Sequence, residues 1–133
     1  MKELEFFINI NPPTTTHQAK RLAVSKSGKP YMFDSEKLKT VKKDLKAKLY
    51  KHKPKAPLEG ACIIDIIIIF KARGQHKEGD PYLLKPDWDN SAKVPQDCLV
   101  ELGFFKDDCI IFDGRVRKFW GDTAGYLIKI KEI

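Results

Sequence analysis

The chain has 133 residues and a formal net charge of +7, with 42% hydrophobic and 32% charged residues. This composition can build one packed core with a charged surface and excludes disordered, collagen-like and membrane-spanning proteins, so we expect one domain over residues 1–133 and no membrane partner. The three cysteines have neither the number nor the spacing of a disulfide framework or a zinc site, which favours a reducing, cytoplasmic compartment.

The amino-terminal segment predicts a strand followed by a loop. Residues 4–10 are rich in β-branched and aromatic residues, and Pro12 ends the strand. Residues 14–30 show no clear period and contain several turn-forming residues, so we expect a long loop there. His17 lies in this loop, where a lone histidine is usually solvated, and we assign it no role.

A basic helix is predicted over residues 35–50, with Ser35 as its N-cap. Its apolar residues recur at helical spacing, at Leu38, Val41, Leu45 and Leu49. Lysines occupy its other faces, and Pro54 stops the helix. The segment therefore predicts an amphipathic helix with a basic outer surface.

The middle of the chain predicts a buried strand, a loop and a second helix. Residues 61–70 are apolar at both alternating positions, which predicts the central strand of a sheet covered on both faces. Residues 71–85 predict a flexible, mildly basic loop. Residues 92–102 predict a helix that Gly103 stops, and Pro95 is tolerated only near the helix start.

The remaining segments predict strands. Residues 109–112 and 115–120 are extended, residues 121–125 form a turn, and residues 126–131 alternate as a final strand. Together the elements predict an α+β fold, a mixed β-sheet with two main helices.

Positive charge is concentrated in the first part of the sequence. Residues 1–60 contain 14 basic and 6 acidic residues, a net of +8, whereas residues 61–133 contain 11 and 12, a net of −1. A one-sided basic surface suits a polyanion such as DNA, while the alternative is a lysine-rich helix kept for solubility. The candidate contacts to the DNA backbone are Lys42, Lys43, Lys46, Arg73 and Lys77.

The stretch 85–113 is acidic, with 7 acidic and 3 basic residues and a net charge of −4. An acidic centre in a basic protein suits metal-dependent phosphodiester cleavage, because carboxylate oxygens hold Mg²⁺ and the ion neutralises phosphate charge. The candidate metal ligands are Asp87, Asp89 and Asp108, with Asp107 as a further candidate. Lys93 is the candidate catalytic lysine, Asn90 and Asp97 are candidates to support the ligands, and Asp113 has no assigned role.

The spacing of these residues predicts a shared site. If the segment is extended, Asp87 and Asp89 project to the same face and can reach one ion. Asp108 heads the following strand, and an antiparallel return would bring it back towards Asp87. Asp97 lies four residues beyond Lys93 and can pair with it across one helical turn.

Simpler roles stay open for the same residues. Acids before a helix can form an N-capping cluster favoured by the helix dipole, and Asp107 and Asp108 can form a solvated turn. At the level of function, the alternatives are a flap-cleaving or nicking metal nuclease and a non-catalytic, basic nucleic-acid-binding module.

The acidic motif resembles the signature of the RusA family of Holliday junction resolvases, of phage and prophage type. The matching pattern is Asp87-x-Asp89-Asn90-x-x-Lys93-x-x-x-Asp97-x-Leu99, then Gly103 and Asp107-Asp108. The likeness extends over most of the chain, from an early strand ending at Pro12 to a closing hairpin that reaches Ile130. The chain departs from the family at residues 14–17, where the family often has a polar Ser-Asn-Asn-like segment.

This resemblance implies a small α+β homodimer that binds four-way DNA junctions and nicks two strands symmetrically with Mg²⁺ or Mn²⁺, in recombination and repair. It also implies that Asp87, Asp89 and Asp108 bind the metal and that Lys93 is catalytic. One domain supplies one site, so cutting two opposed strands requires two copies.

Overall fold

A four-stranded mixed sheet forms the body of the protein. The computed structural model describes residues 2–14, 20–24, 26, 28 and 30–133, with side chains described for 2–14, 26, 28 and 35–133. The strands of the sheet are β1 (Lys2–Asn9), β4 (Cys62–Lys71), β5 (Ile111–Gly121) and β6 (Gly125–Glu132), in the order β1-β6-β4-β5. Strand β4 pairs with β5 in parallel and with β6 antiparallel, so the predicted mixed sheet is confirmed.

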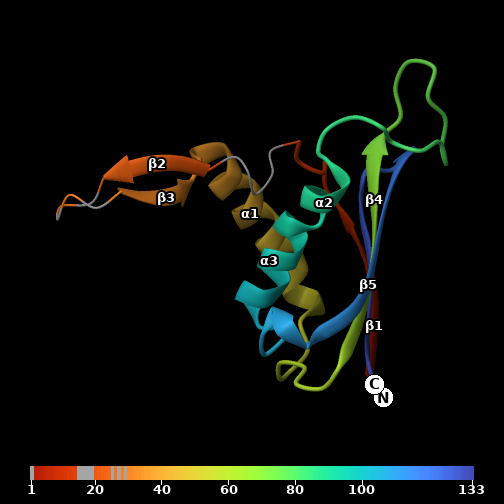
Figure 1. The fold of residues 1–133 in the computed structure, drawn as a ribbon. Coiled ribbons are helices and arrows are strands. Elements are labelled where there is room, and N and C mark those ends of the chain that lie inside the picture. The colour runs from red at the N-terminus through yellow and green to blue at the C-terminus, as the bar shows by residue number, and fades with distance from the viewer. Residues whose placement is uncertain (1, 15–19, 25, 27, 29) are drawn as a thin grey trace.

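The helices lie together on one side of this sheet (Figure 1). They are α1 (Glu36–Leu49), α2 (Trp88–Ser91) and α3 (Lys93–Leu102), with short 3₁₀ helices at Tyr50–His52 and Asp108–Ile110. The predicted cap of α1 is confirmed, because the Ser35 hydroxyl accepts a hydrogen bond from the Leu38 N–H at 3.2 Å. The two main helices and the sheet make the α+β fold that the sequence predicts. No helix among the described residues is long and apolar enough to cross a membrane.

The core lies between the helices and the facing side of the sheet. Alternate residues of β4 are buried there, from Cys62 to Phe70, against the buried leucines of α1 and α3. The residues between them, such as Ile67, are only half-buried. The prediction of a central strand is therefore confirmed, but the prediction of cover on both faces is wrong, because the described helices pack on one face alone.

The segment predicted as a long loop contains regular structure. Strand β2 (Lys20–Val24) pairs antiparallel with β3 (Pro30–Asp34), and this hairpin projects away from the sheet (Figure 1). The prediction of a loop over residues 14–30 is wrong for residues 20–24, because cross-strand backbone hydrogen bonds form extended structure without a two-residue apolar period. His17 lies outside the described residues.

The last two strands are not neighbours. The pieces predicted at 109–112 and 115–120 belong to one strand, β5, which begins after the 3₁₀ turn Asp108–Ile110. The predicted closing hairpin is wrong, because β4 lies between β5 and β6. This order places the apolar residues of β4 at the centre of the sheet. Strand β6 also pairs with β1, so Lys2 lies opposite Glu132 and the two ends of the chain are neighbours.

Candidate active site

The loop before Asp87 is fixed along the edge strand β5. Pro81 forms an isolated antiparallel bridge with Phe119. The Tyr82 N–H donates to the Lys118 carbonyl at 3.1 Å, and the Trp120 N–H donates to the Asp80 carbonyl at 2.8 Å. The segment is an irregular loop, as predicted, but its second half is anchored to the sheet.

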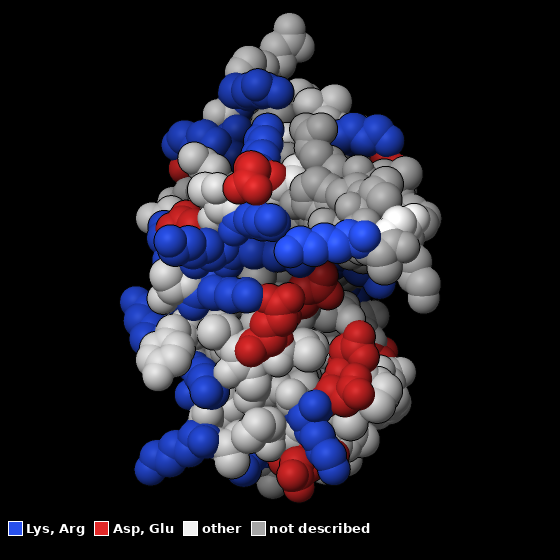
Figure 2. All heavy atoms as spheres, turned by 90° about the vertical axis from the view of Figure 1, so that its left-hand side faces the viewer, with Lys and Arg blue, Asp and Glu red and all other residues white. Residues whose placement is uncertain are grey.

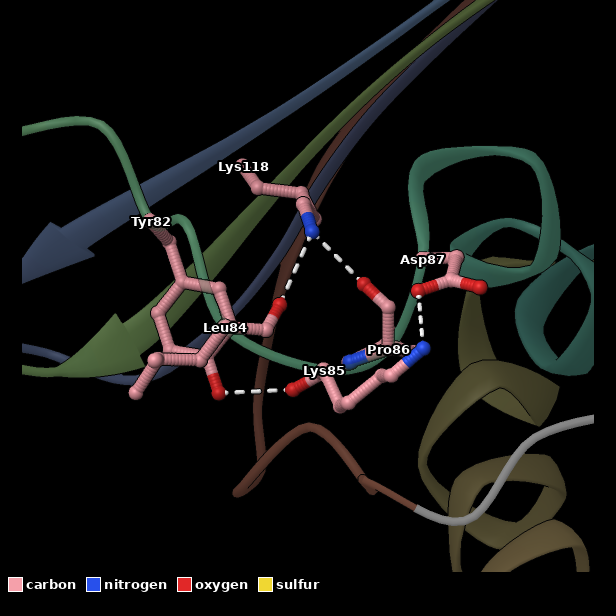
Figure 3. Close-up of polar contacts among 6 residues, drawn as sticks. All are labelled: Tyr82, Leu84, Lys85, Pro86, Asp87 and Lys118. Carbon is pink, nitrogen blue, oxygen red and sulfur yellow. Dashed lines mark hydrogen bonds and ion pairs between the residues drawn. The ribbon is translucent and has the colours of Figure 1, made fainter.

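Side chains of β5 and α2 also hold the backbone on both sides of Asp87. The Lys118 ammonium group donates to the carbonyls of Leu84 at 3.1 Å and Pro86 at 2.6 Å (Figure 3). The Trp88 indole N–H donates to the Val116 carbonyl at 2.8 Å. Burial lowers the pKa of Lys118, and the nearby Asp87 carboxylate opposes that shift.

Asp87 and Asp89 occupy different backbone environments. Asp87 is the extended residue before α2, and its carboxylate pairs with the Lys85 ammonium at 2.6 Å. Within the described structure it makes no capping hydrogen bond to α2, which argues against a capping role. Asp89 is exposed in the helix itself. The condition of an extended Asp-x-Asp segment is therefore not met, because the chain becomes helical at Trp88.

Asp107 and Asp108 form a second acidic group at the 3₁₀ turn before β5. The Asp107 carboxylate caps this turn by accepting a hydrogen bond from the Cys109 N–H at 3.3 Å. A hydrogen bond between the two carboxyl groups raises the pKa of Asp108 and lowers that of Asp107. The charge of Asp97 raises the pKa of Asp108 further, and Lys93 opposes it. The structure thus places Lys93 close enough to Asp108 for the two to interact electrostatically.

The chemistry of these groups fits a hard divalent cation. Carboxylate oxygens are the ligands that Mg²⁺ prefers, and the two like-charged groups Asp107 and Asp108 are stabilised by a proton or a cation between them. However, no three His, Cys, Asp or Glu side chains of the described residues are gathered closely enough to hold a metal ion. Of the predicted ligands, Asp87 pairs with Lys85, Asp108 interacts with Asp107, and Asp89 is exposed on α2.

The lysines of α1 are tied to α3. Lys42 pairs with Asp97 at 3.5 Å, and Lys46 pairs with Glu101. The partner of Asp97 is thus a lysine of the other helix, and the expected pairing with Lys93 across one turn is replaced by this contact. A shallow groove of about 280 Å³ lies along these side chains, lined by Lys39, Lys42, Lys43, Lys46 and Glu101. Figure 2 shows the helical face, where a band of basic side chains lies directly beside clusters of acidic ones.

The other candidate residues are distributed as follows. Arg73 and Lys77 are exposed on the loop after β4, and the Arg73 guanidinium lies over the Trp120 ring at 5.8 Å. Asn90 is a buried residue of α2. Asp113 is exposed on β5 at the register position of Ile63, on the sheet face opposite the helices. Asp113 therefore lies on the opposite face of the sheet from α2 and α3.

Sequence reasoning missed the residues that anchor the Asp87 segment, namely Tyr82, Trp88, Val116 and Lys118. One signal was available for the lysine. Lys118 lies at the same alternating position as Val116 and Trp120, and the register places all three on the helix-covered face of the sheet. A lysine on a covered face indicates a specific polar partner.

Two comparisons with known proteins bear on the identity of the chain. The sequence model of the family described as endodeoxyribonuclease RusA matches residues 11–131. This span includes both acidic groups, Lys93 and the basic helix. No curated protein matches the chain.

Proposed function

Since the chain belongs to the endodeoxyribonuclease RusA family, we propose that it is a structure-specific endodeoxyribonuclease that binds four-way DNA junctions. In this proposal residues 1–133 act as one nuclease domain that resolves junctions by paired symmetric nicks, in recombination and repair. The observation that carries the proposal is the family match over residues 11–131, which covers almost the whole chain.

The proposed reaction depends on Mg²⁺, or on Mn²⁺, held by Asp87, Asp89 and Asp108, with Asp107 as a further candidate. Such an ion, when bound, neutralises phosphate charge and lowers the pKa of a coordinated water. Lys93 acts beside Asp108, where its ammonium group stabilises the negative charge that builds up on the phosphate. The Lys42–Asp97 pair keeps Asp97 engaged between the helices, and buried Asn90 supports the short helix that carries Asp89.

The basic residues hold the DNA backbone in this proposal. Lys43, Arg73 and Lys77 are exposed, and Lys42 and Lys46 line the same groove while pairing with acids of α3. Contacts of this kind position DNA without reading its sequence, and each one adds to the salt dependence of binding. The net charge of +8 over residues 1–60 supports this assignment.

The proposal includes a homodimer acting in the cytoplasm. Two opposed strands of a junction need two sites, and a twofold dimer supplies them in matching orientation. The half-buried apolar residues on the helix-free face of β4, including Ile63, Ile67 and Ile69, are consistent with such an association. Two buried free cysteines, Cys62 and Cys98, suit a reducing compartment.

A cleavage comparison tests the function. A labelled four-way junction, a matched linear duplex and a matched flap substrate are incubated with the protein in Mg²⁺ and in EDTA. We expect cleavage of the junction alone, in Mg²⁺ alone, with nicks at symmetric positions in opposed strands. Equal rates on all three substrates would instead identify a general or flap-cleaving metal nuclease and overturn the resolvase assignment.

A non-catalytic DNA-binding module is the second candidate, favoured because no three His, Cys, Asp or Glu side chains of the described residues are gathered closely enough to hold a metal ion. Asp89→Asn separates it from the nuclease. The nuclease proposal predicts that the variant binds junction DNA as well as wild type but no longer cuts it. The binding-module proposal predicts that neither protein cuts DNA.

A further inference from the structure

We propose that Lys118 is a positioning residue that presents Asp87 for metal binding. The inference rests on the proposed function, in which Asp87 is a metal ligand. Lys118 itself touches neither metal nor substrate in this proposal. It acts through the backbone of the segment that leads into Asp87.

Three consecutive carbonyls before Asp87 are held by side chains. The Lys118 ammonium group accounts for the carbonyls of Leu84 and Pro86, at 3.1 and 2.6 Å. The carbonyl between them, that of Lys85, accepts from the Tyr82 hydroxyl at 2.8 Å. Figure 3 shows the Leu84 and Pro86 carbonyls converging on one ammonium group. The backbone therefore enters Asp87 with its orientation fixed at each of the three preceding residues.

The backbone is also anchored immediately after Asp87. The Trp88 indole donates to the Val116 carbonyl at 2.8 Å, so the same strand, β5, anchors both sides of the aspartate. Lys118 lies over the Tyr82 ring, with 5.4 Å between its nitrogen and the ring centroid. Removing the ammonium group leaves the two carbonyls without their hydrogen-bond donor. It also removes the contact with the Tyr82 ring.

Lys85 gives a matched contrast, because it contacts the carboxylate of Asp87, whereas Lys118 contacts the backbone before it. Its ammonium group pairs with the Asp87 carboxylate itself, and its side chain is 78% exposed. A cation that binds Asp87 competes with Lys85, whereas it benefits from the orientation that Lys118 imposes. The two lysines are therefore expected to affect metal affinity with opposite signs.

Calorimetric titration with MnCl₂ tests this contrast on the full chain. We expect Lys118→Met to weaken Mn²⁺ binding about 10- to 100-fold, the range found when a residue that orients a ligand is removed. We expect Lys118→Arg to bind more tightly than Lys118→Met, because its guanidinium still offers donors to both carbonyls. Lys85→Met is expected to tighten binding by at most about fivefold, the scale of an exposed ion pair.

Two further measurements separate positioning from a general loss of structure. In Lys118→Met, amide hydrogen exchange is expected to rise at residues 87–90 while β4 and β6 keep the protection of wild type. Tyr82→Phe keeps the ring that stacks on Phe70 at 3.6 Å and loses only the donor to Lys85, so it is expected to weaken Mn²⁺ binding less than Lys118→Met. This variant keeps the test available if Lys118→Met fails to fold.

The outcomes are distinct for the two proposals. Unchanged or tighter Mn²⁺ binding by Lys118→Met would mean that the lysine acts only as a nearby positive charge, and it would overturn the positioning role. A wild type that binds no Mn²⁺ would overturn it as well. A wild type that binds Mn²⁺ but cuts no junction would overturn the proposed function, while the order of affinities still decides the role of Lys118.

Discussion

The two acidic groups of the protein differ in how their charge is balanced. At Asp87 the carboxylate has a lysine partner, Lys85, and the backbone around it is held by side chains. At Asp107 and Asp108 the two carboxyl groups hydrogen-bond each other, and a third acid adds to the repulsion. The first group is therefore balanced by the protein itself. The second carries more negative charge than Lys93 offsets, and a proton or a cation stabilises it.

Removing a carboxylate from the second group gives the largest expected effect. Asp108→Asn is expected to lower single-turnover cleavage of a four-way junction by more than about 100-fold, beyond the loss seen for residues that only orient ligands. Binding of the junction in EDTA should be unchanged or tighter, because one negative charge near the DNA is lost.

Asp113→Asn is the control, since this residue lies on β5, shortly after the turn that carries Asp108, and on the helix-free face of the sheet. Its cleavage rate is expected to stay within about twofold of wild type. A large loss in Asp113→Asn, or none in Asp108→Asn, would contradict the placement of the site.

The second test concerns the competition between a proton and Mn²⁺ at Asp108. The raised pKa of Asp108 means that this group is protonated at a higher pH than an ordinary aspartate, so a proton competes with Mn²⁺ as the pH falls through that pKa. Asp107→Asn removes the largest cause of the shift and keeps a side-chain oxygen to cap the turn. Its loss of Mn²⁺ affinity on acidification should therefore occur at lower pH than in wild type. Titrations between about pH 7 and pH 4 measure this, and coincident curves would contradict the proposed coupling.

In Asp97→Asn the loss of Mn²⁺ affinity on acidification is also expected to move to lower pH, but by less than in Asp107→Asn. The charge of Asp97 is a lesser cause of the raised pKa of Asp108. This change also removes the ion pair with Lys42, so thermal unfolding should show a loss of about 0 to 1 kcal/mol in stability. If the pH shift were larger than in Asp107→Asn, Asp97 and not Asp107 would be the main cause of the raised pKa of Asp108.

The elements that the sequence predicted correctly are those with a local signal. The apolar spacing from Leu38 to Leu49 and the cap at Ser35 lie within α1 itself, and Gly103 adopts the left-handed conformation that ends α3. The β2–β3 hairpin has no apolar alternation, and it is defined by the pairing of its two strands. The insertion of β4 between β5 and β6 is also a long-range pairing that no local pattern encodes.

The candidate site shows the same division between local and long-range information. Residue type and spacing pointed to the acids and to Lys93, because carboxylates and lysine carry the chemistry. Their arrangement in space could not be predicted, since it depends on where β5 runs relative to α2 and α3. The contact between Lys118 and Pro86 joins residues 32 positions apart, and only the folded sheet brings them together.

The pairing of Lys2 with Glu132 has a practical consequence. Because these two residues are adjacent, a linker of only a few residues could join the ends into a closed ring without changing the order of the strands. New ends could then be opened in another exposed loop. Since the chain ends meet at the far end of the sheet from α2 (Figure 1), an immobilisation handle attached to either one would leave the Asp87 segment facing away from the support.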